Sequence, residues 1–132
     1  MRTNYIENEY AKFWIQDEWL LCIQYKARLE ITLDVAIDCS AIRMELSNEE
    51  IRPMFSDARN AVSIQKEARR YLSRQTAYVS AGAFLIDSGF HKALGGLFIA
   101  LNRPPIPTRL FTNEKEAIKW LSLYKCQKDE LM

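Results

Sequence analysis

The chain has 132 residues, of which 48% are hydrophobic, 11% aromatic and 27% charged. This length and composition are typical of one globular domain and exclude a disordered, collagen-like or membrane-embedded chain. Eighteen Lys and Arg residues against seventeen Asp and Glu residues give a net charge of +1, so no overall positive field draws nucleic acid to the surface. We therefore expect a single domain over residues 1–132 that binds no nucleic acid.

Targeting signals and redox chemistry give the next expectations. The first residues hold no apolar run that could form the core of a signal peptide, and the longest apolar stretches, such as 93–101, are about half the ~20 residues of a membrane helix. Cys22, Cys39 and Cys126 are widely spaced and match no metal or redox motif. We expect reduced, mostly buried thiols in a cytoplasmic protein that has neither a metal nor a membrane contact.

Strand patterns fill the first quarter of the chain. Residues 12–16 and 19–25 are rich in aromatic and β-branched side chains and predict a hairpin, with a loop slightly longer or less ideal than a two-residue turn. Residues 3–10 either extend the first strand or form another edge strand. A helix over about 32–46 follows, capped by Thr32, with an inner stripe formed by Val35, Cys39, Ile42 and Leu46.

Short strands then alternate with helices. The pattern predicts a strand at 53–56 and a helix from a Ser63 cap to about Thr76. The continuous apolar run at 81–86 is the best candidate for a central strand. A third helix follows from 87–89 and ends before the prolines at 104–107, and a last strand spans 108–111. Thr112 or Asn113 caps the final helix.

The predicted order is therefore β-β-α-β-α-β-α-β-α. An N-terminal hairpin followed by alternating strands and helices predicts an α/β fold. We expect a mixed sheet that is covered by helices and whose later strands are mostly parallel.

Three stretches resemble the bacterial STAS-like domains, and more closely the small stand-alone SpoIIAA-like proteins of unknown function. They are residues 53–59 leading into the Ser63 helix, residues 80–86, and residues 104–112 leading into 116–121. The resemblance covers most of the chain. It implies a STAS/SpoIIAA-like fold and a non-enzymatic regulatory role through protein-protein contacts.

The resemblance also raises the question of a phosphorylated serine. Regulatory STAS domains carry one, in an Asp-Ser-type motif, at the start of the helix after the strand that residues 54–57 resemble. Ser63 lies near this position without the acidic neighbour, and a helix cap accounts for it. Ser88 follows Asp87 as in the motif, but it comes after a different strand. Phosphorylation of Ser63 or Ser88 stays open.

Residues suited to catalysis are scarce. His91 is the single histidine, and no spacing around it completes a nucleophilic triad or a zinc site. The four glycines match neither a phosphate loop nor a dinucleotide fingerprint. We expect no enzyme activity and no cofactor. The alternative is a small-ligand-binding protein or a cryptic hydrolase, with a pocket where open α/β sheets place ligands, formed by Asp57, Arg59, Asp87, Ser88 and His91.

Two surfaces remain as candidates for binding. Lys66, Arg70 and Arg74 recur every four residues on one predicted helix, with Arg69 beside them and Arg59 upstream. This basic face is either a solvated surface or a site for an acidic partner or a phosphorylated ligand. The predicted third helix is apolar around more than one face, so it is either buried on several sides or forms a homodimer surface through Leu94, Leu97 and Phe98.

Overall fold

The α/β class predicted from the sequence is confirmed by a computed structural model that describes residues 1–87 and 104–125. The predicted third helix, including Ser88, His91, Leu94, Leu97 and Phe98, lies outside these residues. The described elements are β1 (Arg2–Glu7), β2 (Ala11–Gln16), β3 (Leu20–Tyr25), β4 (Leu29–Ile31), α1 (Leu33–Ser47), β5 (Arg52–Asp57), β6 (Ala61–Ile64), α2 (Lys66–Arg74), β7 (Val79–Leu85), β8 (Thr108–Phe111) and α4 (Glu114–Ser122).

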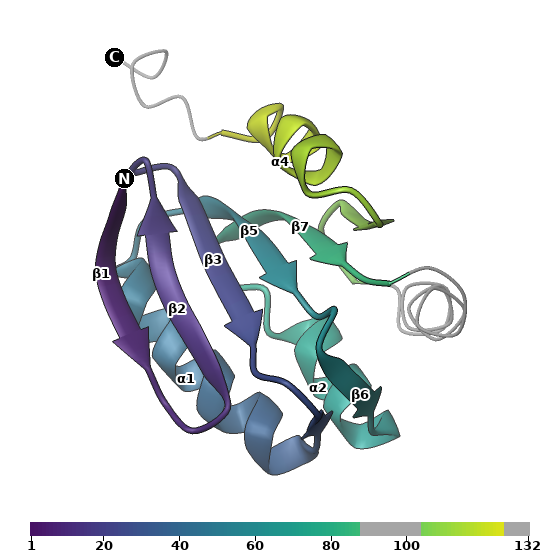
Figure 1. Cartoon of the computed structure of the whole chain (residues 1–132). Helices are drawn as coiled ribbons and strands as arrows, with labels where there is room; N and C mark the ends of the chain where they lie inside the picture. The colour runs from purple at the N-terminus through teal and green to yellow at the C-terminus, as the bar shows by residue number, and fades with distance from the viewer. Residues whose placement is uncertain (88–103, 126–132) are drawn as a thin grey trace.

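The main sheet is mixed, as predicted, with the strand order β1-β2-β3-β5-β7-β8 (Figure 1). β1, β2 and β3 pair antiparallel, whereas β3, β5, β7 and β8 pair parallel. β7 is an interior strand, as predicted for the apolar run at 81–86: it pairs with β5 on one side and with β8 on the other. β3 and β5 occupy the centre. β4 and β6 form a separate two-stranded parallel sheet.

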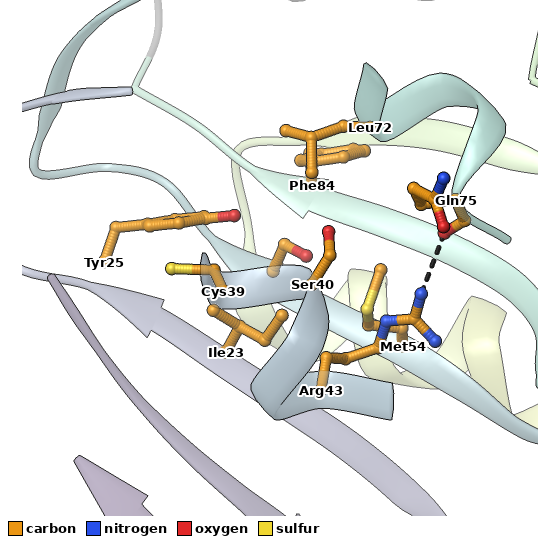
Figure 2. A pocket seen from close by; sticks show the side chains of 10 residues that line it. Ile23, Tyr25, Cys39, Ser40, Arg43, Met54, Leu72, Gln75 and Phe84 are labelled. Atoms are coloured by element: carbon orange, nitrogen blue, oxygen red, sulfur yellow. Dashed lines mark hydrogen bonds between the residues drawn. The ribbon is translucent and has the colours of Figure 1, made fainter. Parts of the chain in front are cut away.

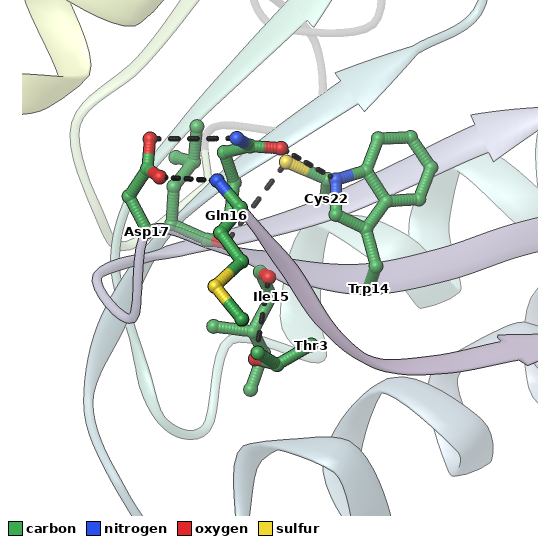
Figure 3. Close-up of polar contacts among 8 residues, drawn as sticks. Thr3, Trp14, Ile15, Gln16, Asp17 and Cys22 are labelled. Carbon is green, nitrogen blue, oxygen red and sulfur yellow. Dashed lines mark hydrogen bonds and ion pairs between the residues drawn. The ribbon is translucent and has the colours of Figure 1, made fainter.

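The N-terminal hairpin agrees with the predicted one. Gln16 pairs with Leu20 across a three-residue loop, in which Asp17 and Glu18 take φ angles of 51° and 68°. Neither residue is glycine, which fits the expectation of a less ideal turn. The Gln16 side chain accepts a hydrogen bond from Trp14 Nε1 at 3.1 Å and donates one to Asp17 at 3.4 Å (Figure 3).

Helices cover the sheet on both faces. Alternate residues of β2 and β3, such as Phe13 and Ile23, join α1 and α2 in one hydrophobic cluster. The residues between them, such as Trp14 and Cys22, join Ala117 of α4 in a second cluster. α1 and α2 therefore lie side by side on one face and α4 lies on the other.

Helix starts agree with the sequence at two places and differ at a third. Thr32 caps α1, where its hydroxyl accepts a hydrogen bond from Val35 N at 3.3 Å. Ser63 does not cap α2, because it lies within β6 and the N-cap residue is Gln65. Two β-branched apolar residues, Val62 and Ile64, flank Ser63 and favour a strand. Pairing with β4 extends this strand up to the helix.

Asn113 is the cap of α4, because its side chain accepts a hydrogen bond from Glu116 N at 3.0 Å. Replacing Asn113 by alanine is expected to lower the free energy of unfolding by about 1 kcal/mol, since a backbone N–H of the first turn loses its partner. Urea unfolding measures this loss. Thr112→Ala is the matched control, and an equal loss for both variants would contradict the assignment of the cap.

Among the described residues, no helix combines the length and the apolar character that a membrane span requires.

Candidate functional site

The carboxyl ends of the parallel strands carry a polar group that we call the strand-end cluster: Gln24, Asp57, Arg59 and Asp87. Asp57 is the last residue of β5 and is only 4% exposed. Its Oδ1 accepts a hydrogen bond from Arg59 Nε at 2.9 Å, and its Oδ2 accepts one from Arg59 Nη2 at 2.7 Å. The structure therefore brings together two residues that the sequence placed in the same loop region.

Further donors complete the coordination of the Asp57 carboxylate. Arg59 N donates to Oδ1 at 3.2 Å, and Gln24 Nε2 donates to Oδ2 at 3.4 Å. Burial by itself raises the pKa of Asp57, but the hydrogen bonds and the charge of Arg59 outweigh it and hold the pKa below its usual value. Both oxygens of the carboxylate are thus engaged, and the group is held ionised.

The acidic residues around Arg59 affect its pKa. Its pKa is raised, first by the hydrogen bond to Asp57, and the charges of Glu114 and Asp87 act in the same direction. Asp87 itself is exposed beyond the end of β7. Within the cluster, Arg59 compensates the charge of Asp57, and the predicted members Ser88 and His91 lie outside the described residues.

The second predicted site is the basic face of α2, which we define as Lys66, Arg70 and Arg74. All three side chains are exposed, and they lie opposite the buried Ala68 on the helix. Within residues 1–87 and 104–125, no ion pair engages any of the three. Arg59, which the sequence grouped with them, instead directs its guanidinium to Asp57.

Arg43 was missed by the sequence interpretation. It lies on the inner face of α1 and is only 2% exposed. Its guanidinium donates to Gln75 O at 2.9 Å (Figure 2) and to Ala77 O at 2.6 Å, just beyond the end of α2. The negative end of the α2 dipole offsets the buried charge. Arg43 thus ties α1 to the end of α2.

A cavity lies between α1, α2 and the sheet, beside Arg43 (Figure 2). It measures about 30 Å³, and a second one beneath α2 is of the same size. Such a space holds about one or two water molecules, whereas metabolite sites run to roughly 300 Å³ or more. Within the described part of the chain, neither cavity fits a metabolite.

The two described cysteines are free and buried, as the sequence predicted. Burial raises the pKa of Cys22 to about 12 and that of Cys39 to about 11, so both thiols stay protonated near neutral pH and are poor nucleophiles. Among the described residues, no group of His, Cys, Asp and Glu side chains could hold a metal ion.

The sheet order and the two helical layers match a SpoIIAA-like fold. A similar crystal structure is that of an uncharacterised DUF3478-family protein with a SpoIIAA-like fold from Shewanella loihica PV-4. The two match with a TM-score of 0.59 and 10% identity, over 88% of this chain and 98% of the other. Residues 13–125 match the domain of unknown function DUF7793, and the chain belongs to that family. No curated protein matches the sequence.

Proposed function

We propose that the chain is a non-enzymatic binding module that acts through protein-protein contacts, and that the basic face of α2 binds an acidic protein surface. One observation carries this proposal: Lys66, Arg70 and Arg74 are exposed, aligned on one helix and, within the described residues, not engaged in ion pairs. Like charges at this spacing repel one another, and an acidic partner relieves the repulsion.

A ligand-binding protein or cryptic hydrolase is the second candidate, because the strand-end cluster lies where open α/β sheets bind ligands. The exposed Asp87 favours it. Two observations weigh against it: the Asp57 carboxylate is already engaged by Arg59 and Gln24, and the two described cavities are small. The proposal therefore gives the strand-end cluster a structural role.

We also propose that the module works in the cytoplasm. The free thiols of Cys22 and Cys39 support this assignment, since cytosolic proteins keep their thiols reduced.

Reversing two charges on the basic face of α2 is expected to abolish capture of the partner. Arg70→Glu combined with Arg74→Glu replaces attraction to an acidic surface by repulsion, while the exposed side chains contribute little to stability. Affinity capture from extracts of the source cell, quantified by mass spectrometry, measures the loss. Thermal unfolding should shift by no more than a few degrees.

The matched control makes the same charge change on another helix. Lys115→Glu combined with Lys119→Glu reverses two exposed charges of α4 at the same four-residue spacing. This control should capture the partner like the wild-type chain. Retained capture by the α2 variant, or equal loss in both variants, would contradict the proposed surface.

A further inference from the structure

The outer face of α1 carries two parallel stripes. An apolar stripe consists of the exposed Leu33, Ile37 and Ala41 and the half-buried Met44. At about 100° per residue, these side chains lie on one shoulder of the helix. An acidic stripe of three exposed residues lies beside it: Asp34, Asp38 and Glu45. A helix that only covers a sheet needs no exposed apolar stripe.

The two stripes lie on different sides of the outer face. Ser40 and Arg43 on α1 adjoin Leu72 and Gln75 at the cavity (Figure 2). The apolar stripe lies next to Ser40 and Arg43, so it is on the α2 side of the exposed face of α1. Each acid directly follows a residue of the apolar stripe in the sequence and therefore lies about 100° further round the helix, away from Ser40 and Arg43. The acidic stripe is therefore on the side away from α2.

α1 and α2 run in the same direction, because each returns the chain between neighbouring parallel strands. Arg43 donates to Gln75 O, a separation of 32 residues. Because the helices run in the same direction, the end of α1 that carries Asp34 and Asp38 lies toward the start of α2, which carries Lys66 and Arg70. The helical face thus carries an acidic stripe, an apolar stripe and the basic face of α2 in that order.

We propose that a second copy of the chain binds this face, in an isologous dimer whose two-fold axis runs along the apolar stripe. This inference rests on the proposed function and names its acidic partner. Rotation about that axis sets the acidic stripe of each copy against the basic face of α2 of the other. The apolar stripes meet between them. A two-fold axis across the helices would set acid against acid, so the charge pattern selects one orientation.

A charge-swap experiment tests the dimer. One variant carries Arg70→Glu and Arg74→Glu, and the other carries Asp38→Lys and Glu45→Lys. Each alone opposes like charges at both stripes of the dimer, and its dissociation constant in sedimentation equilibrium should rise by at least about tenfold. Mixing the two variants restores attraction at both stripes, so a heterodimer of near wild-type affinity should form.

The controls separate this inference from the proposed function. Lys115→Glu with Lys119→Glu on α4 should dimerise like the wild-type chain. If a swap variant unfolds, the wild-type protein still gives an answer, because its dissociation constant must rise with NaCl. A monomeric wild-type chain, or a mixture that fails to associate, would overturn the inference. The wild-type chain could also prove monomeric and capture a different protein, with that capture lost when Arg70 and Arg74 are replaced by Glu. This result would overturn the dimer but not the proposed function.

Discussion

Replacing Arg43 by alanine is expected to lower the free energy of unfolding by about 3 kcal/mol. The change empties a site that is only 2% exposed and removes the donors that serve the carbonyls of Gln75 and Ala77. Those carbonyls lie just beyond the end of α2, so the loss also loosens the attachment of that helix to α1. Urea unfolding of the wild-type and variant proteins measures the difference.

Two further variants identify the cause of the loss. Arg43→Met fills much of the volume without the charge, so it should restore part of the stability lost in Arg43→Ala. Arg70→Ala removes an exposed arginine and should change stability by no more than about 0.5 kcal/mol. If Arg43→Ala lowers the free energy of unfolding no more than Arg70→Ala does, the buried hydrogen bonds of Arg43 between α1 and the end of α2 contribute nothing to stability.

Replacing Arg59 by alanine is expected to destabilise the protein by about 3 kcal/mol at pH 7, because a buried carboxylate loses its charged partner. In the wild-type fold the pKa of Asp57 is lowered, so its contribution to stability is present above the unfolded pKa of about 3.9 and is lost as the pH falls through the folded value. Without the Arg59 side chain, only the backbone N–H of residue 59 and the Gln24 side chain oppose the effect of burial, so the folded pKa of Asp57 rises. The folded variant then binds the proton more tightly than the unfolded chain.

Because Arg59→Ala changes the folded pKa of Asp57 from lowered to raised, the stability difference between variant and wild type depends on pH. As the pH falls from 7 to 4, the Asp57 carboxyl of the Arg59→Ala variant is protonated, so the difference from wild type should shrink. Asp57→Asn is the control: it leaves Arg59, whose side chain is 44% exposed, in contact with water and should cost about 1 kcal/mol. Urea unfolding at both values of pH tests this, and a difference that grows toward pH 4 would contradict the account.

The sequence was sufficient for the elements with long or strongly patterned segments. The aromatic hairpin, α1 with its Thr32 cap, and α4 with its Asn113 cap all follow from local physics. β4 and β6 could not be predicted, because Leu29–Ile31 is too short to show a period. Ser63 was assigned to a cap because serine favours that position, and pairing between β4 and β6 overrode the preference.

The candidate sites also divide into those that the sequence located and those that depend on contacts between distant segments. The basic face of α2 depends only on spacing within one helix, so the sequence located it. Arg43 gave a weaker signal: a cation four residues after the core residue Cys39, on the same stripe. The ion pair between Asp57 and Arg59 was not predicted, because both residues had been assigned by their positions after strands rather than by their contacts. The apolar stripe of α1 was missed because its members alternate with acids along the sequence.

The identity of the binding surface is tested most directly by photo-crosslinking in intact cells. Benzoylphenylalanine replaces Arg70 on α2, Asp87 at the strand-end cluster, or Lys119 on α4, all of which are exposed. We expect protein adducts, including adducts to a second copy of the chain, from position 70 and none above background from positions 87 and 119. Adducts from position 87 with none from position 70 would contradict the proposed binding surface.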